Sequence, residues 1–301
     1  MLVGCGVYYE YNVYMKSGVV LRSATGEPDC ATIDAEQQSR CLVCFECDNT
    51  TVIEGITVTG GRAIGGIYYG GGARCEVTAA VFRRCIFTGN VADVGGGVAC
   101  LGASPRFEDC VFFENYAGTG GGVGCTYSSP EFARCLFSGN WAEYYGGGLW
   151  CEVECSPLLS RCTLVENGAV NGGGGIGCQY ECSPMLRNTI ITFSGYGEAI
   201  WREYDNCNPL LFCCNLYGNA GGDWTDFIVD QWGKNGNFAS DPSFCDMANG
   251  DLTVAENSPC LPGNHPSGYT CGDVIGCHGQ GCAVPEIIKL TTWSSIKAIY
   301  R

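Results

Sequence analysis

The chain has little positive charge and almost no histidine, and each shortage argues against a class of function. Its 301 residues include 16 lysines and arginines but 31 aspartates and glutamates, which gives a formal net charge of −15. Nucleic acids and anionic membrane surfaces are bound by clustered basic residues, so we expect neither as a partner. The two histidines are too few to suggest a metalloprotein, and we expect no metal and no other cofactor.

Long hydrophobic runs and a secretion signal are also missing. No apolar stretch approaches the roughly 18–20 residues that a membrane-spanning helix needs. The opening segment, "MLVGCGVYYEYNVYMKSG", has no basic start or continuous apolar stretch, and Leu2 and Val3 already read as part of a strand. Either the mature chain is shown or its beginning is missing, and we favour the second. Hydrophobic residues still make up 46% of the chain, enough to bury a large core.

Cysteine, by contrast, is abundant, and its positions form a repeat. The 24 cysteines indicate an oxidising compartment, and therefore an extracellular or cell-surface protein. The stretch "CIFTGNVADVGGGVAC" returns as "CVFFENYAGTGGGVGC", "CLFSGNWAEYYGGGLWC" and "CTLVENGAVNGGGGIGC", with leading cysteines 25, 25 and 27 residues apart. The leading positions are Cys85, Cys110, Cys135, Cys162 and later Cys214, and the trailing positions are Cys100, Cys125, Cys151 and Cys178.

A period of this length determines the fold class. Each repeat contains three short strand-like pieces separated by turn residues, and none has the apolar spacing of a helix. Three strands in about 25 residues cannot bury an apolar face alone, but stacked coils form parallel sheets around one continuous core. The sequence therefore predicts an all-β, right-handed parallel β-helix of about eight coils, with three strands per coil, over residues 1–219.

The segment after this repeat is turn-rich and cysteine-rich. We expect residues 220–282 to form an irregular C-terminal cap, because a bare final coil would expose sheet edges. The tail, 283–301, has apolar residues three apart, which predicts a short amphipathic helix. These residues are Leu290, Trp293, Ile296 and Ile299.

In a β-helix, equivalent side chains of successive coils lie about 4.8 Å apart. We expect the recurring asparagines to form a structural ladder of side-chain hydrogen bonds, and the glycines to supply positive φ at sharp bends. The ladder residues are Asn90, Asn115, Asn140, Asn167 and Asn219. The stacked cysteines are expected to be mostly buried thiols, since parallel Cβ vectors would strain a disulfide between coils; paired vertical disulfides are the alternative.

Three disulfides are predicted from local spacing. Cys245 and Cys260 bracket a hairpin-like segment and form the first candidate pair. Cys155 and Cys182 each arrive with a one-residue insertion, which suggests the loop clips Cys151–Cys155 and Cys178–Cys182. A vertical link from Cys182 to Cys207 is the alternative.

The Phe-x-x-Asn pieces at 87–90, 112–115 and 137–140, together with the Gly-Gly-Gly runs, resemble the repeats of chlamydial polymorphic outer-membrane proteins. The chain is more similar still to bacterial secreted right-handed β-helix repeat proteins. Their counterpart segments here are "GVVLRSATGEPDCATIDA", "VIEGITVTGG", "SDPSFCDMANGDLTVAENSPCLP" and "TTWSSIKAIYR". This resemblance covers nearly the whole chain and implies a secreted or surface location in bacteria. It implies little about activity.

The sequence shows no obvious catalytic constellation. Many parallel β-helices cleave acidic polysaccharides with carboxylates and a basic residue, or with paired aspartates. Here the arginines lie at coil corners with variable neighbours, and a charge of −15 would repel a polyuronate. Glu152, Glu154 and Glu181 are weak calcium candidates, although an acidic solvated face is the simpler interpretation. We name no catalytic residue.

Aromatic residues near the ladder asparagines are candidates for binding. If exposed, they could stack on sugars or contact a partner. They are Tyr116, Trp141, Tyr144, Tyr145 and Trp150. We expect a non-enzymatic structural or adhesive protein that self-associates end to end into filaments, with a polysaccharide lyase, a hydrolase or a glycan-binding module as the alternative.

Overall fold

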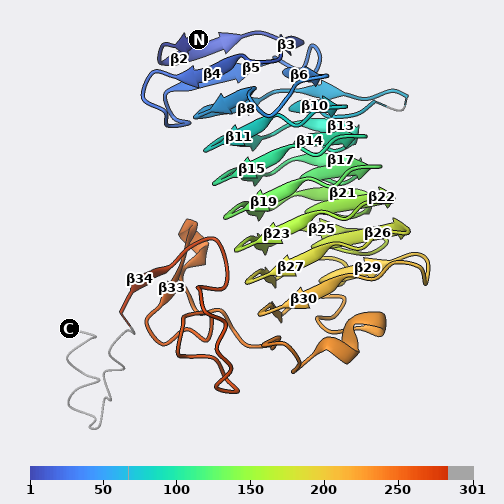
Figure 1. Cartoon of the computed structure of the whole chain (residues 1–301), viewed down its shortest axis with the longest axis vertical. Helices are drawn as coiled ribbons and strands as arrows, with labels where there is room; N and C mark the ends of the chain where they lie inside the picture. The colour runs from blue at the N-terminus through green and yellow to red at the C-terminus, as the bar shows by residue number, and fades with distance from the viewer. Residues whose placement is uncertain (67, 284–301) are drawn as a thin grey trace, which may run out of the picture.

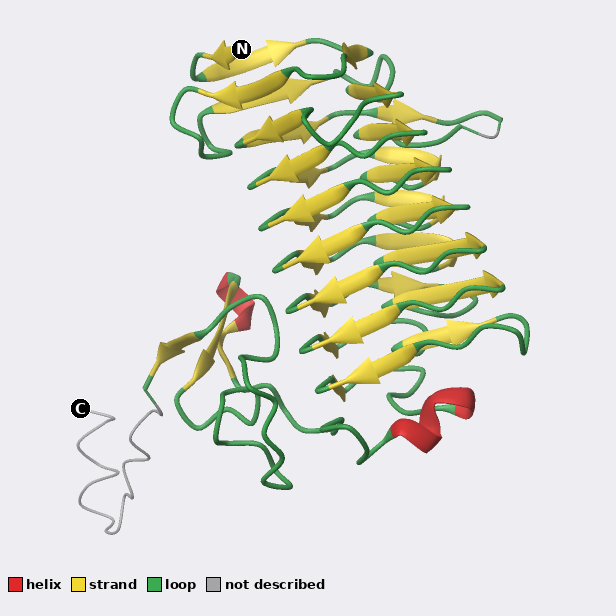
Figure 2. Cartoon of the chain, viewed as in Figure 1, coloured by secondary structure: helices red, strands yellow, loops and turns green. Residues whose placement is uncertain are grey.

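The computed structural model describes residues 1–66 and 68–283. Its short strands stack coil upon coil into an elongated parallel β-helix, with the N-terminus at one end and an irregular cap beside the other (Figure 1). Strands and loops make up nearly all of the described chain, with two short 3-10 helices near the C-terminus (Figure 2). The predicted all-β parallel β-helix with three main sheets is confirmed.

The three main sheets run along the rod. Sheet A consists of β1 (Leu2–Val3), β4 (Val20–Ser23), β7 (Val52–Glu54), β11 (Val81–Arg83), β15 (Arg106–Glu108), β19 (Glu131–Ala133), β23 (Leu158–Ser160), β27 (Met185–Arg187) and β30 (Leu210–Phe212). Sheet B consists of β2 (Gly6–Tyr9), β5 (Ala31–Asp34), β8 (Ile56–Thr59), β12 (Ile86–Thr88), β16 (Val111–Phe113), β20 (Leu136–Ser138), β24 (Thr163–Val165), β28 (Ile190–Thr192) and β31 (Asn215–Tyr217). Sheet C consists of β3 (Val13–Met15), β6 (Leu42–Phe45), β10 (Ala73–Glu76), β14 (Val98–Leu101), β18 (Val123–Thr126), β22 (Leu149–Val153), β26 (Ile176–Tyr180) and β29 (Ile200–Arg202).

A fourth, shorter sheet was not predicted. Sheet D consists of β9 (Arg62–Ala63), β13 (Val91–Val94), β17 (Tyr116–Thr119), β21 (Trp141–Tyr145) and β25 (Gly168–Ala169). The prediction of about eight coils was also too low, because sheets A and B each hold nine strands. The coils built from β1 to β6 lack the Asn and Gly-Gly-Gly signals, so the repeat alone undercounts them.

Phenylalanine fills the middle of the core. Phe82, Phe107 and Phe132 stack along sheet A with ring centroids 4.9 and 5.1 Å apart. A second row on sheet B, formed by Phe87, Phe112 and Phe137, meets the first edge to face. All six side chains are buried, and the middle ring of each row, Phe107 or Phe112, stacks between two others.

Four of the five predicted ladder asparagines, Asn90 to Asn167, form a continuous buried row. The Asn140 side chain donates to the Asn167 side-chain oxygen at 2.9 Å and to the Phe112 carbonyl at 2.8 Å. Its own oxygen accepts from the side chain and backbone amide of Asn115 at 3.0 and 3.1 Å. The same pattern links Asn90 to Asn115. Ser194 interrupts the row, and its backbone amide donates to Asn219.

The glycine runs recur mainly because successive coils approach closely. In the run 95–97, only Gly95 has positive φ, at 69°. A Cβ atom on Gly97 would lie 2.6 Å from the carbonyl oxygen of Gly122 in the next coil. The prediction that the runs supply positive φ is therefore correct for the first glycine of each three-residue run, and for Gly172 and Gly173 in the run 172–175. The other glycines leave room for backbone stacking.

The cysteines that begin each repeat act as hydrogen-bond donors. The Cys135 thiol is 3.4 Å from the Phe107 carbonyl of the preceding coil and 3.5 Å from the Ala133 carbonyl. Thr189 takes this position in a later coil, and its hydroxyl contacts the equivalent carbonyls of Leu159 and Arg187. Burial raises the pKa of the Cys214 thiol in the same column to about 12, so the thiol keeps the proton that it donates.

The trailing cysteines lie on sheet C in one register. Cys100 pairs with Cys75 and Cys125, and Cys151 pairs with Cys125 and Cys178 across parallel strands. All of them are free and fully buried. They fill the core as small apolar side chains.

The three predicted disulfides are wrong. Cys151 and Cys155 are both free, as are Cys178, Cys182 and Cys207. The added cysteines form a separate corner column, in which the Cys182 sulfur accepts the Cys155 backbone amide at 3.4 Å. Cys245 pairs instead with Cys282, while Cys260 faces sheet B and accepts from the Asn215 side chain at 3.4 Å. A further disulfide, Cys5–Cys30, joins two adjacent coils with a Cα–Cα distance of 4.3 Å.

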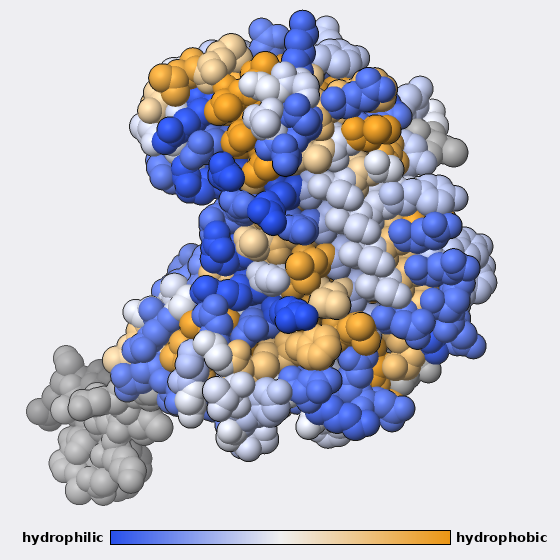
Figure 3. Space-filling view, viewed as in Figure 1, coloured by the Kyte–Doolittle hydropathy of each residue, from blue (hydrophilic) through white to orange (hydrophobic). Residues whose placement is uncertain are grey.

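The last part of the described chain folds against the flank of the rod. It contains η1 (Asp226–Gln231), η2 (Met247–Asn249), and a sheet of β32 (Phe244–Asp246), β33 (Asp251–Ala255) and β34 (Gln280–Cys282). Ile190 of sheet B forms a small core with Phe238, Cys260 and Ile275. In the space-filling view the outline is indented between this part and the N-terminal coils (Figure 3). The helix that we predicted in the tail, 283–301, falls outside the described residues, which end at 283.

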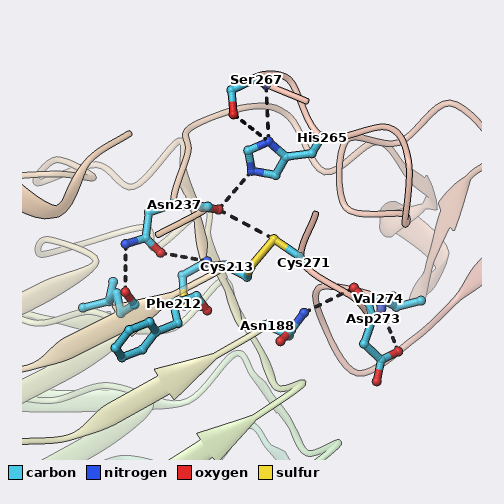
Figure 4. Close-up of a disulfide and its surroundings, with 12 residues drawn as sticks. Asn188, Phe212, Cys213, Asn237, His265, Ser267, Cys271, Asp273 and Val274 are labelled. Atoms are coloured by element: carbon cyan, nitrogen blue, oxygen red, sulfur yellow. Dashed lines mark hydrogen bonds between the residues drawn. A yellow bond between two sulfur atoms is a disulfide. The ribbon is translucent and has the colours of Figure 1, made fainter. Parts of the chain in front are cut away.

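Two kinds of contact hold this flank in place. The disulfide Cys213–Cys271 ties it to the coil that follows β30 (Figure 4). Close by, the Asn188 side chain donates to the Asp273 carbonyl at 3.2 Å, and Arg161 pairs with the Asp273 carboxylate at 3.3 Å. Cap residues thereby bury part of the outer face of sheet B, at Thr163, Ile190 and Asn215.

The asparagine row predicts a specific stability effect. Asn140→Ala removes side-chain bonds to two coils and leaves the Phe112 carbonyl and the Asn115 amides without this partner. We expect the free energy of unfolding to fall by about 3 kcal/mol, measured by chemical denaturation. Asn171→Ala, at an exposed position, is the matched control and should change stability by less than about 0.5 kcal/mol. Equal losses in both variants would contradict the role of the row.

The Cys213–Cys271 disulfide predicts a second effect. Replacing both residues by serine should destabilise the protein by about 3 kcal/mol, because the bond closes a long loop in the unfolded chain. The Cys245→Ser/Cys282→Ser variant is the control for losing a disulfide within the cap. Limited proteolysis should cut the 260–280 segment faster in the first variant than in the second; the reverse order would show that Cys213–Cys271 does not fasten the cap.

Candidate functional site

Sheet D presents the most distinctive outer surface of the rod. Its inward positions are alanines that are nearly or fully buried, at 63, 92, 117, 142 and 169. One residue earlier, the outward side chains lie in register along the rod axis. They are Arg62, Val91, Tyr116, Trp141 and Gly168. A bridge from Gly168 to Tyr196 continues this row into the next coil.

A hollow of about 650 Å³ opens over this face; we call it the sheet D groove. Val91 and Tyr116 lie on its floor, with Arg62 at its N-terminal end and Tyr144 at the other. Residues 64–66, which follow β9, also line it. The volume lies within the range of small-ligand sites and could accept a few sugar rings.

The two carboxylates of the groove already have partners in the protein. The Tyr116 hydroxyl donates to the Glu143 carboxylate, and this bond raises the pKa of Tyr116 to about 12. Asp93 accepts the backbone amides of Gly66 and Tyr68 at 3.2 and 3.0 Å. Asp93 therefore anchors the loop after β9, and Glu143 orients the ring of Tyr116.

Arg62 differs from most arginines of the rod. Elsewhere, ion pairs join Arg83 to Glu108, Arg106 to Glu131 and Arg134 to Asp109. Arg62 is exposed and has no ion-pair partner within the part of the chain that the structure describes. Its guanidinium is available to a bound molecule.

The predicted binding aromatics divide into two groups. Tyr116 and Tyr144 line the groove with 39% and 51% of their surface exposed. Trp141 lies next to Tyr116 in the row. Its ring covers Gly168, where a Cβ would lie 2.7 Å from the indole, and it meets Tyr196 edge to face at 5.2 Å. These residues form a line of rings along the axis.

Tyr145 and Trp150 do not belong to the groove. Trp150 is buried, with 3% of its surface exposed, on the outer face of sheet C. Tyr145 is stacked between Trp150 and Trp201, with centroid distances of 5.3 and 4.5 Å. The prediction that Trp150 is a binding residue is wrong, because the side chain is buried. The neighbouring residues in the sheet, Gly124 and Gly177, have no side chains, so the Trp150 ring packs flat on the sheet.

The weak calcium candidates do not form a site. Over residues 1–66 and 68–283 no three His, Cys, Asp or Glu side chains gather in a metal-binding arrangement. Glu152 instead accepts from the Thr126 hydroxyl at 2.7 Å. Glu154 and Glu181 occupy equivalent turn positions with φ near +50°, where their carboxylates project as parts of a solvated acidic face.

Known proteins match this architecture as a whole. A family model described as the right-handed beta helix region matches residues 40–222, and the chain belongs to this family. No curated protein matches the chain. Among solved structures it is similar to the crystal structure of pectate lyase Pel9A, with a TM-score of 0.41 and 12% identity over 93% of this chain and 87% of that one. A similarity this low, in sequence and in structure, carries no argument about activity.

No helix in the described part of the chain is long and apolar enough to cross a membrane. The sequence interpretation missed Arg62, Asp93 and Glu143 as groove residues, and Tyr196 as a member of the row beside the groove. A signal for them existed, because an alanine follows each outward residue of sheet D. Aligning these alanines across the repeats would have revealed the fourth sheet and the row beside it.

Proposed function

We propose that this protein is a non-enzymatic binding scaffold at the cell surface or outside the cell, a stiff rod whose adhesive face is the sheet D groove. The observation that carries the proposal is the axial line of rings formed by Tyr116, Trp141 and Tyr196 beside an open hollow. Rings of this kind stack on the apolar faces of sugars. A glycan chain lying along the axis could contact several of them at once.

The polar groups of the groove also favour binding over chemistry. Glu143 is engaged with the Tyr116 hydroxyl and Asp93 with two backbone amides. Such fixed groups orient a ligand without being free to exchange protons. The row of rings continues along the rod axis beyond the groove, to Trp141 and Tyr196, which suits an extended polymer better than a small enclosed substrate.

A polysaccharide-active enzyme is the second candidate. It is favoured by Arg62, a free basic group in the same groove as the carboxylates of Asp93 and Glu143. A basic residue beside carboxylates is the kind of cluster that cleaves acidic polysaccharides in many parallel β-helices, although here both carboxylates would have to leave their present partners. Incubation with neutral and acidic polysaccharides, followed by assays for new reducing ends and unsaturated sugars, separates the two; product formation that Arg62→Gln abolishes would favour the enzyme.

The binding proposal predicts the outcome of a glycan array. We expect the wild type to retain a neutral glycan, and Trp141→Ala to bind it about three- to tenfold more weakly because one stacking contact is lost. Tyr9→Ala, an exposed aromatic far along the rod, is the control and should bind as the wild type does. Retention that is unchanged in Trp141→Ala and in Tyr116→Ala would exclude the groove as the site.

Self-association end to end is part of the same proposal. At the N-terminal end β1, β2 and β3 are each the last strand of their sheets, and a mostly apolar hollow of about 340 Å³ lies between them. A strand edge that no preceding coil covers pairs readily with another chain. Light scattering should show mass that increases with concentration, and Val7→Lys, which places a charge on β2, should reduce it. A constant monomer mass across concentrations would contradict the filament proposal.

A further inference from the structure

We propose that Arg40 and Arg74 form a binding site for an oxyanion, a carboxylate, sulfate or phosphate group, on the outer face of sheet C. The site lies next to the N-terminal end of the sheet D groove but is separate from it. It does not depend on the proposed function of the groove.

The fold brings the two arginines to one surface. Arg74 lies on β10 between the buried residues Ala73 and Cys75, so its side chain points away from the core. Arg40 precedes β6, the strand that pairs with β10. The backbone amide of Arg62 donates to the Ser39 carbonyl at 2.9 Å, which places Arg40 at the corner between sheets D and C.

Both guanidinium groups contain a buried donor without an acceptor. The Nε atoms of Arg40 and Arg74 are inaccessible to solvent and make no hydrogen bond in the structure. Arg74 is partly satisfied, because one of its terminal nitrogens pairs with Glu76 at 2.6 Å. Arg40 has no ion-pair partner among the described residues. A buried donor left unpaired is unfavourable. Because solvent does not reach Nε in this arrangement, an oxyanion would bind first at the terminal nitrogens, and a shift of the side chain would then let Nε donate to it as well.

The charges around Arg40 also favour binding of an anion. Burial lowers the pKa of Arg40, and the neighbouring charge of Arg74 lowers it further. Glu76, Tyr14 and Tyr68 oppose this shift, but the only carboxylate among them is already paired with Arg74. A pair of like charges therefore persists in a protein whose net charge is −15. An anion between them would remove this repulsion.

The chemistry of the ligand follows from the donor set. A guanidinium presents its two terminal nitrogens as a fork that matches two oxygens of one oxyanion. Carboxylate, sulfate and phosphate share that geometry. Because the site adjoins the groove, an acidic substituent of a sugar is one source, and a free inorganic ion is another.

Thermal unfolding in sulfate tests the site. At constant ionic strength, replacing chloride by sulfate should raise the melting temperature of the wild type, because the anion binds only the folded state. The Arg40→Gln/Arg74→Gln variant should lose this rise. Arg106→Gln, which removes an arginine paired with Glu131 on sheet A, should keep it. Equal sulfate effects in the wild type and the Arg40→Gln/Arg74→Gln variant, or no effect beyond chloride, would overturn the proposal.

Parallel titrations distinguish the sources and give a readout that does not depend on stability. Inorganic phosphate, acetate, glucuronate and glucose 6-sulfate are added to the ¹⁵N-labelled protein, and the arginine Nε–Hε signals are followed. We expect the signals of Arg40 and Arg74 to shift; tighter binding of the sugar acids than of acetate and inorganic ions would assign the glycan source. Unmoved signals with every anion would exclude the site. Neutral-glycan binding by the Arg40→Gln/Arg74→Gln variant reports on the groove alone, so the two proposals fail separately.

Discussion

Parallel stacking of coils in one register is the constraint on which the rest of this structure depends. Each coil hydrogen-bonds its backbone to the next, so every side chain has a neighbour of equivalent position about 4.8 Å away. Each position therefore favours a residue type that packs well against the same residue type in the next coil. Asparagine satisfies this condition because its amide donates in one direction and accepts in the other. Glycine satisfies it at positions such as Gly97, where a carbonyl of the next coil occupies the space of a side chain.

The same constraint explains the cysteines. In the column of Cys135, the thiol donates to backbone carbonyls, and Thr189 performs the same task with a hydroxyl. On sheet C, the cysteines from Cys75 to Cys178 serve as small apolar filling. The structural disulfides lie at the margins: Cys5–Cys30 in the first coils, and Cys213–Cys271 and Cys245–Cys282 around the cap. Covalent bonds are thus found in the first coils, within the cap and where the cap meets the last coil, and not between the regular coils that the structure describes.

The sequence predicted the repeat-based parts of the molecule well and the irregular parts poorly, for physical reasons. Period and turn residues determine the parallel β-helix, because three short strands in about 25 residues bury their apolar faces only when the coils stack. They do not determine disulfides, because the partner of Cys245 is set by how β34 returns to β33, a contact that spacing cannot reveal. The binding aromatics show the same division. Tyr116 and Tyr144 were found from their position near the ladder, whereas the burial of Trp150 depends on two glycines in neighbouring coils.

One irregularity within the repeat has consequences for how such a rod diversifies. Between β17 and β21 the register shifts, so that Thr119 faces Tyr145 and one residue of β21 is left over. The shift is confined to sheet D: the next strands of sheet C, β18 and β22, still pair Cys125 with Cys151. Single insertions are thus absorbed at this corner without disturbing the core. Evolution can therefore vary the outer residues of sheet D coil by coil, in length as well as in chemistry, while the interior stays unchanged.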